Sequence, residues 1–389
     1  MDRQTKSAAH DLTNVASNDE AGASGTVVTG MAKAKKELPG YLEFFAGSGL
    51  VAYGMRAHFN AIWANDICGK KADVYCANHG KKHFHLGSIA DVKGADLPAA
   101  PLSWASFPCQ DLSLAGLIAG IGGERSGLVW EWLRVMDEMA DMPPILVAEN
   151  VVGLMSVDGG SQYRMLHEAL ISRGYRVGVV QLDAAHWVPQ SRPRVFVVGV
   201  KKSINIPAGL LTDGPTWAHS RAVVNAAVGV NGWLWWNLPT PKPRKLDLAD
   251  IIEWDAACDD AVTSVRNISL IPDRHRKLLD NSVVNVAAGY KRTRAVGQVL
   301  ELRFDGIAGC LRTPKGGSSR QFLVLKKGSK LATRLLTVRE TARLMGAPET
   351  FKLPGTYNDG YKAMGDAVAA PCASYLAKHL LAPLLSAPA

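Results

Sequence analysis

The sequence has few cysteines, and they form no recognisable metal or disulfide pattern. The six cysteines among the 389 residues include no CxxC pair, so neither a zinc site nor a disulfide framework is predicted. No uninterrupted apolar run reaches the roughly 18 residues that a membrane span needs, and residues 1–14 lack the apolar core of a signal peptide. These absences speak against the secreted and membrane classes. We expect a cytoplasmic protein without a metal site or membrane association.

An excess of positive charge is absent from most of the chain and is concentrated in one segment. Residues 41–200 carry 13 basic and 15 acidic side chains, whereas residues 201–345 carry 23 basic and 12 acidic ones. Clustered Lys and Arg are typical of surfaces that neutralise phosphates and release counterions. A solvated basic face without a partner is the alternative at this point.

Four stretches differ in pattern. Residues 1–38 are rich in small and polar residues, and we expect a disordered tail. Residues 39–205 alternate short apolar runs with segments of helical spacing, which predicts an α/β, Rossmann-like, mostly parallel sheet with flanking helices. Residues 206–330 lose this alternation and indicate a smaller irregular domain, and residues 331–389 are expected to return to the first domain.

The first predicted strand runs into a glycine-rich turn. In "EFFAGSGLVA", Gly47 and Gly49 stand between this strand and a helix, and Asp66 ends the next strand. Glycines let a backbone turn tightly and approach a ligand, and an acid at the second strand end can bind ribose hydroxyls. A nucleoside cofactor is predicted. The loop alone does not distinguish a nicotinamide dinucleotide from S-adenosylmethionine, and a purely structural turn is also possible.

A thiol and a carboxylate follow two further strands. Pro108 fixes φ and offers no ladder hydrogen bond, so the strand "LSWAS" must end with Cys109 in the following loop. The strand "ILVAEN" ends in Glu149, and carboxyl ends of parallel strands share one edge of a sheet. Arg192 and Arg194 then introduce another strand and can bind phosphate or a carboxylate, or lower the pKa of a thiol.

These segments together resemble the DNA cytosine-C5 methyltransferases. The motifs that carry the resemblance occur in the family's order: "FAGSG", "FPCQDLS", "ENVVGL", "VPQSRPRVFVVG", "LTVRETARLMGAPETF" and "GDAVAAP". It extends from Tyr41 to about Leu385, except for the middle of the basic segment. It implies the fold of S-adenosylmethionine-dependent methyltransferases plus a DNA-recognition domain.

The resemblance implies methyl transfer from S-adenosylmethionine to C5 of a cytosine in a specific double-stranded DNA sequence. Cys109 would add to C6 of a flipped-out cytosine, because C5 of the intact ring is a poor nucleophile. Glu149 would stabilise the intermediate at N3, and Arg192 and Arg194 would complete the catalytic set.

Two further sets of residues follow from the same motifs. The expected cofactor contacts are Phe45, Ala46, Gly47, Ser48, Gly49, Asp66, Ile67, Ser88, Ile89, Pro108, Asp366, Ala367 and Val368. The expected DNA contacts are Gln110, Ser113, Lys291, Arg292, Arg294, Arg312, Ser318 and Arg320. Within this second set, "GYKRTRAVGQ" (289–298) is our candidate for a base-contacting loop, and a loop that contacts only phosphates is the alternative.

Three positions depart from the family pattern. Ser88 stands where an aspartate usually contacts the adenine amino group, Ser106 replaces a glycine two residues before Pro108, and Asp366 replaces an asparagine of the last motif. None of these changes removes a catalytic group.

Other functions fit the sequence less well. A tRNA cytosine-C5 methyltransferase keeps the chemistry, but the basic segment is large and "GCLRTPKGGSSRQ" resembles the DNA-modifying members. A nicotinamide-dependent oxidoreductase explains only the glycine loop, and an inactive DNA-binding relative conflicts with the retained Cys109 and Glu149. We expect a monomer that binds double-stranded DNA, paired with a restriction endonuclease for the same site.

Overall fold

The computed structural model describes residues 37–108, 127–295, 297–312, 320–328 and 330–386. Residues 38–389 form one compact unit, separate from residues 1–37. Almost the whole expected tail therefore lies outside the described residues.

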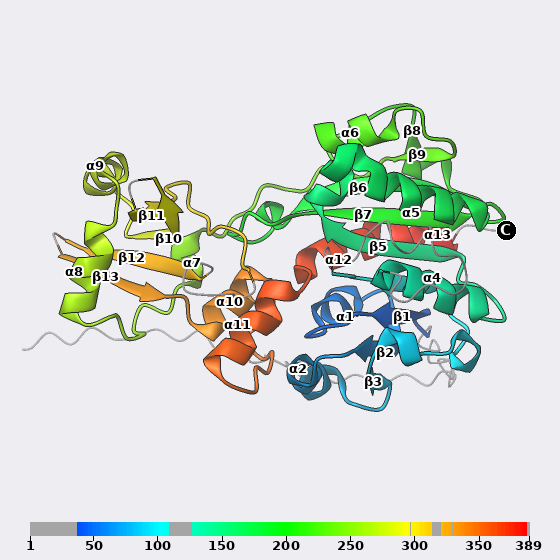
Figure 1. Cartoon of the computed structure of the whole chain (residues 1–389), viewed down its shortest axis with the longest axis horizontal. Helices are drawn as coiled ribbons and strands as arrows, with labels where there is room; N and C mark the ends of the chain where they lie inside the picture. Colours follow the sequence, from blue (N-terminus) through cyan, green and yellow to red (C-terminus); the bar gives the residue numbers. More distant parts are fainter. Residues whose placement is uncertain (1–36, 109–126, 296, 313–319, 329, 387–389) are drawn as a thin grey trace, which may run out of the picture. The chain divides into compact units, whose positions relative to one another are not determined.

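The first nine strands of the chain form one sheet (Figure 1), in which the strand order is β3-β2-β1-β4-β5-β7-β6-β9-β8. Strands β1 to β5 run parallel to one another, whereas β7 lies antiparallel between β5 and β6. The strands are β1 (Gly40–Phe44), β2 (Asn60–Asp66), β3 (Phe84–Leu86), β4 (Leu102–Ala105), β5 (Ile145–Val151), β6 (Tyr175–Asp183), β7 (Pro193–Lys201), β8 (Leu211–Thr212) and β9 (Trp233–Trp236). The expected mostly parallel α/β sheet is confirmed.

Helices cover both faces of this sheet, which explains why its central strands are apolar throughout rather than alternating. One face packs against α1 (Leu50–Met55) and the C-terminal helices, and the other packs against α4 (Leu128–Glu138) and α5 (Ser161–Ser172). Helix α4 buries Val129, Trp132, Leu133 and Met136, the spacing of an amphipathic helix. Helix α2 (Gly69–His79) follows β2, and α6 (Arg221–Ala227) precedes β9.

A second, four-stranded antiparallel sheet has the order β11-β10-β12-β13. Its strands are β10 (Val286–Arg294), β11 (Gly297–Leu302), β12 (Gln321–Lys327) and β13 (Lys330–Leu335). Helices α7 (Leu248–Ile251), α8 (Ala261–Ser269) and α9 (Asp273–Asn281) precede it along the chain. Leu279 of α9 joins Leu300 and Val324 of the sheet in a separate small core.

The large sheet extends further along the chain than the sequence pattern predicts. Strands β8 and β9 fall inside the range 206–330 that we assigned to the second domain, yet β9 pairs with β6 and β8 pairs with β9. Trp236 is fully buried in the core of the large sheet. The tryptophan-rich stretch around it reads as irregular because β8 and β9 are only two and four residues long.

The last helices of the chain pack into the core of the large sheet. Helix α10 (Val338–Leu344) begins with a capping box in which Thr337 and Glu340 satisfy each other's backbone groups. Helices α11 (Tyr357–Asp366), α12 (Ala370–Leu376) and α13 (Ala382–Ser386) follow. The span Tyr357–Ser386 is long and apolar enough to cross a membrane by composition, but 61% of its most apolar window is buried inside the protein. This burial is typical of a core helix.

Candidate active site

The predicted site residues follow strands whose carboxyl ends lie side by side. Phe44 at the end of β1 is in register with Asn65 of β2 and with Ala105 of β4, and Ala105 is in register with Ala148 of β5. The glycine loop, Asp66, Pro108 and Glu149 therefore share one edge of the sheet, as expected for an open α/β fold.

The glycine loop has a constrained backbone. Gly47 and Gly49 have φ angles of 57° and 80°, and Phe45 has φ 57°, which is rare for a residue with a side chain. A Cβ on Gly49 would lie 2.6 Å from the His79 ring and 2.8 Å from the Tyr75 ring. Only glycine fits at this position. The strained Phe45 backbone is of the kind often found at ligand sites.

Asp66 closes this loop onto the second strand. Its carboxylate accepts hydrogen bonds from the backbone N–H groups of Gly47 (2.9 Å) and Cys68 (2.8 Å). The next side chain, Ile67, is 73% exposed. An exposed apolar side chain beside an ordered carboxylate is suited to a planar base and a ribose.

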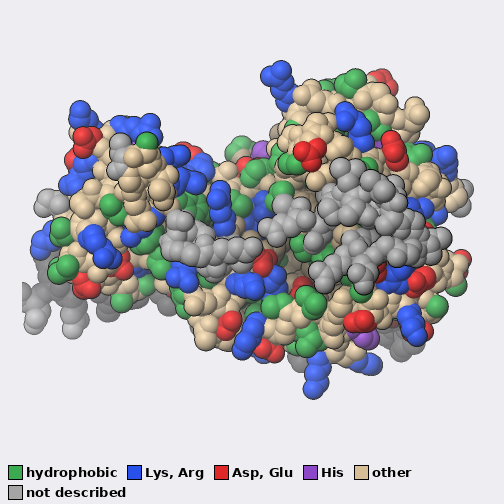
Figure 2. All heavy atoms as spheres, viewed as in Figure 1, with side chains coloured by type: hydrophobic (Ala, Val, Ile, Leu, Met, Phe, Trp, Pro, Cys, Tyr) green, Lys and Arg blue, Asp and Glu red, His purple; other side chains and the backbone are tan. Residues whose placement is uncertain are grey.

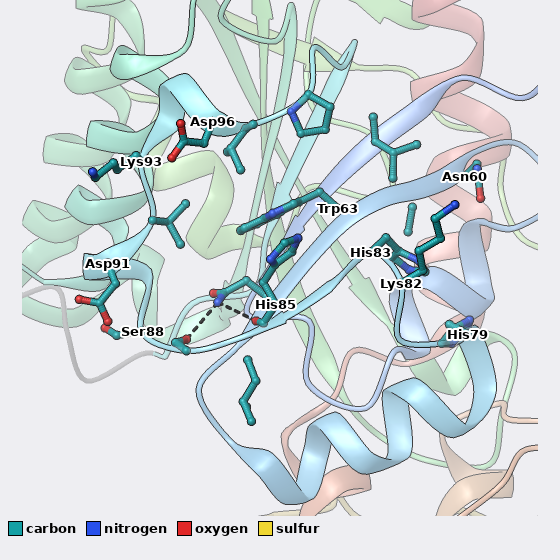
Figure 3. A pocket seen from close by; sticks show the side chains of 18 residues that line it. Asn60, Trp63, His79, Lys82, His83, His85, Ser88, Asp91, Lys93 and Asp96 are labelled. Carbon is teal, nitrogen blue, oxygen red and sulfur yellow. Dashed lines mark hydrogen bonds between the residues drawn. The ribbon is translucent and has the colours of Figure 1, made fainter.

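A cavity of about 900 Å³ lies along β2 and β3 (Figure 3), and its lining includes Trp63, His85, Gly87 and Ser88. Asn65 donates hydrogen bonds to the carbonyls of His85 and Gly87 and so shapes its floor. The cavity adjoins the expected adenine contact at Ser88. Its lining does not include Glu149 or Arg194, so this cavity is not the pocket for a target base.

Two of the departures from the family pattern have structural partners. Ser88 accepts a hydrogen bond from the Ala90 N–H, which caps a short helical turn. Asp366 forms a 2.7 Å ion pair with Lys71 of α2. Ser48 donates to the Ala363 carbonyl, so α11 is tied directly to the glycine loop. Lys71 carried no signal in the sequence, because its partner lies almost 300 residues away.

A buried acid lies beneath the glycine loop. Glu43 of β1 is 1% exposed and accepts a 2.7 Å hydrogen bond from the Tyr41 hydroxyl, while its Oε1 has no partner among the described residues. Burial raises the pKa of Glu43 to about 8, although the Tyr41 hydrogen bond opposes the shift.

Glu149 is held by neighbours from two strands. It is 7% exposed, and the Arg194 Nε lies 3.3 Å from its Oε1. Burial raises the pKa of Glu149 above its ordinary value, whereas Arg194, Arg192 and a hydrogen bond from Ser106 act to lower it. Asn150 donates to the Phe107 carbonyl at 3.0 Å, which ties the end of β5 to the residues before Cys109. A buried acid with a raised pKa is suited to proton donation.

The two arginines that introduce β7 have different surroundings. Arg194 contacts Glu149, but Arg192 is 1% exposed and donates to the carbonyls of Leu311, Gly365 and Ala367. Burial lowers the pKa of Arg192 to about 10. These contacts show that Arg192 holds three backbone segments together beside the site.

The candidate base-contacting loop is in fact a β-hairpin. Residues 289–294 belong to β10 and 297–302 form β11, and Gly297, at the start of β11, has a positive φ of 105°. Arg292 and Arg294 both pair with Glu301, and the Lys291 ammonium lies 4.5 Å from the Phe322 ring centroid. We did not predict a strand here because two glycines flank the three cations.

Cations from two segments lie around Tyr290, and a third predicted DNA contact, Arg320, lies by α11. The Arg292 and Arg312 guanidinium groups lie 5.4 and 5.8 Å from the ring centroid of Tyr290, whose hydroxyl donates to the Cys310 carbonyl. Arg320 donates to the Asn358 side chain of α11. Figure 2 shows further Lys and Arg side chains spread over the visible face.

Four predicted residues lie outside the described part of the chain: Cys109, Gln110, Ser113 and Ser318. Among the residues that the structure describes, no group of three His, Cys, Asp or Glu side chains is arranged to hold a metal ion.

The fold and this sheet edge define a Rossmann-like methyltransferase, and comparison with known proteins specifies the family. Residues 40–382 match the family model of C-5 cytosine-specific DNA methylases. The chain belongs to this family and is a DNA cytosine-C5 methyltransferase. The nicotinamide alternative is therefore wrong, and the DNA assignment prevails over tRNA.

Individual relatives agree with the family match. The type II methyltransferase M.Bsp6I of Bacillus sp. is 26% identical over 349 residues, which cover 88% of this chain and 98% of the relative. M.FnuDI of Fusobacterium nucleatum is 27% identical over 347 residues, covering 87% and 93%. The Dnmt2 methyltransferase of S. pombe has the same fold, with a TM-score of 0.58, 19% identity and coverage of 89% and 98%. A putative DNA modification methyltransferase from an E. coli prophage has a TM-score of 0.54 at 20% identity, covering 90% and 100%.

Proposed function

We propose that this methyltransferase acts through a covalent bond between Cys109 and C6 of a flipped-out cytosine in a specific double-stranded DNA sequence. The observation that carries the proposal is the Glu149–Arg194 pair at the end of β5, beside the Phe107–Pro108 segment that leads into Cys109. The described segment ends at Pro108 on the sheet edge that carries Glu149, and this supports a site where a base extruded from the duplex meets both the carboxyl and the next residue's thiol.

We propose S-adenosylmethionine as the methyl donor, and the residues present fit it. Gly47 leaves space on one side of the loop, Asp66 can bind ribose hydroxyls, and the exposed Ile67 offers an apolar surface to adenine. When bound, this cofactor supplies an electrophilic sulfonium methyl group for C5 of cytosine.

The chain's own groups account for the activation of the base. Addition of the Cys109 thiolate to C6 moves electron density toward N3, and Glu149 donates its proton there. Arg194 stabilises the carboxylate that remains. After methylation a base removes the C5 proton, the C6–S bond breaks, and the Cys109 thiolate is released.

Recognition of the DNA sequence belongs, in this proposal, to the four-stranded sheet and the segments around it. The segment 201–345 holds the excess of cations, and β10 to β13 lie within it. The division into a catalytic part, a recognition part and a returning C-terminal part follows the predicted boundaries, except that β8 and β9 go with the catalytic part.

Bisulfite sequencing of DNA from cells that express the protein tests the reaction and reads the modified base with its sequence context. We expect Cys109→Ser to lose nearly all methylation while binding S-adenosylmethionine in calorimetry with the wild-type affinity. Cys258→Ser, at an exposed thiol, is the matched control and should keep full activity. Retained methylation by Cys109→Ser would refute the covalent mechanism.

We also propose that the protein is a monomer and that it lies in the cytoplasm in association with the nucleoid. A partner restriction endonuclease would act on the same DNA site. The matched relatives M.Bsp6I and M.FnuDI are type II methyltransferases. If a partner nuclease exists, DNA methylated by this protein will resist it at the site that bisulfite sequencing identifies.

A further inference from the structure

Ser106 lies beside the catalytic carboxyl. Strands β4 and β5 are parallel, and their last paired residues are Ala105 and Ala148. One step further along each strand places Ser106 next to Glu149, and side chains at equivalent positions of neighbouring strands point to the same face. The Ser106 N–H also donates to the Phe44 carbonyl at 3.3 Å, which continues the β1–β4 contact beyond the strand end.

The direction of the Ser106 hydroxyl follows from its other partner. The Trp104 indole N–H lies 2.9 Å from Ser106 Oγ, and Trp104 is fully buried. An indole N–H can only donate, so Ser106 Oγ must accept this hydrogen bond. The single hydroxyl proton is then free for a second partner, and the β4–β5 register places the Glu149 carboxyl beside it.

We propose that Ser106 is a positioning residue that orients the Glu149 carboxyl and stabilises it once it has given its proton to the base. The inference rests on the proposed function, because it assumes that Glu149 is the proton donor. A glycine, which the family has at this position, offers neither the hydroxyl nor an acceptor for Trp104. In this proposal Ser106 links the Trp104 indole to the Glu149 carboxyl, and a glycine would remove that link.

The charged and titratable neighbours of Glu149 set the pH dependence that this arrangement implies. Arg194 and Arg192 approach from the β7 side, Cys372 from α12 interacts electrostatically with Glu149, and Ser106 approaches from β4. A hydrogen bond to the ionised carboxylate lowers its pKa. Removing the Ser106 hydroxyl should therefore raise the pKa of Glu149 and weaken it as an acid.

The test is the pH dependence of single-turnover methyl transfer by Ser106→Ala and Ser106→Thr. We expect Ser106→Ala to lower the plateau rate by about tenfold, the effect of losing one hydrogen bond to a charged group. Its alkaline limb should move to higher pH, because the acid form of Glu149 persists longer. Ser106→Thr retains the hydroxyl and should restore both the plateau and the limb.

Ser103→Ala is the matched control, because Ser103 lies on the same strand and accepts a 2.9 Å hydrogen bond from the indole N–H of Trp132. It should lower the melting temperature without moving the alkaline limb. Trp104→Phe removes the donor that orients Ser106 and should shift the limb in the same direction by less, which provides a second variant if Ser106→Ala folds poorly.

An alkaline limb unchanged in both Ser106→Ala and Trp104→Phe would overturn the proposal, as would an equal shift in Ser103→Ala. A failure of the proposed function would appear in a different experiment: Cys109→Ser would still methylate DNA, whatever the result for the Ser106 variants.

Discussion

Replacing Glu149 by Gln keeps the size of the side chain and removes its acidic proton. The wild-type carboxyl is 7% exposed, with the Arg194 Nε 3.3 Å from Oε1. The amide oxygen of Gln can still accept a hydrogen bond from Arg194, so we expect the site to keep its geometry. Comparing Glu149→Gln with the wild type therefore measures the effect of the acidic proton without a change in packing.

The expected loss can be worked from these contacts. A positioned general acid contributes about 10²–10⁴ in rate, which corresponds to roughly 3–5 kcal/mol of activation free energy. The free energy of unfolding should fall by less than the roughly 3–5 kcal/mol typical of breaking a buried ion pair. The Arg194 side chain keeps 14% exposure and still donates to the Pro193 carbonyl, so its charge is not stranded.

The pH dependence gives the direction of a second effect. Burial raises the pKa of Glu149, so its acid form predominates below that raised value and disappears as the pH rises through it. The wild-type rate should therefore fall on the alkaline side with the titration of Glu149, and Glu149→Gln should lack this limb.

The assay is single-turnover transfer of a labelled methyl group to cognate duplex over a range of pH, with cofactor affinity measured by calorimetry. We expect a large loss of rate with nearly unchanged cofactor binding. A rate and a pH profile indistinguishable from those of the wild type would remove Glu149 from the mechanism.

Two further predictions concern stability and recognition. Burial raises the pKa of Glu43 to about 8, so its contribution to stability is fully present below its unfolded-state pKa and is lost as the pH rises from that value through about 8. Wild-type melting temperatures should fall over this pH range, and those of Glu43→Gln should not. Equal slopes for the two proteins would contradict this. Lys291, Arg292 and Arg294 replaced singly by Ala should reveal a base contact as a loss of roughly 1–3 kcal/mol of discrimination at one base position. A uniform loss of binding with a shallower salt dependence would instead make the hairpin a phosphate clamp.

Local patterns in the sequence were enough to predict the sheet edge. The apolar runs that become β1, β2, β4 and β5 indicate buried parallel strands, and such strands bring their carboxyl ends together whatever the loops between them do. The turn at Gly47 and Gly49 and the acid at Asp66 could be expected at this edge, because each directly follows an apolar run.

The hairpin at β10 and β11 was not predictable in the same way. Three of the last four residues of β10 are cations, and the pairing of Arg292 and Arg294 with Glu301 depends on cross-strand contacts that the sequence does not reveal. The expectation of a loop failed because strand pairing is a property of two segments together.

The sequence by itself determined which segments become buried strands and which chemical groups follow them, because both depend on residues adjacent in the chain. Only the tertiary structure decided which groups touch: the β4–β5 register places Ser106 beside Glu149, and folding brings Asp366 to Lys71. The tertiary structure also gives the two arginines different contacts. Arg192 is buried and donates to three backbone carbonyls, whereas Arg194 pairs with Glu149. The physical reason is that hydrogen bonds and ion pairs form over about 3 Å, and residues far apart in the chain come that close only after the strands and helices have packed.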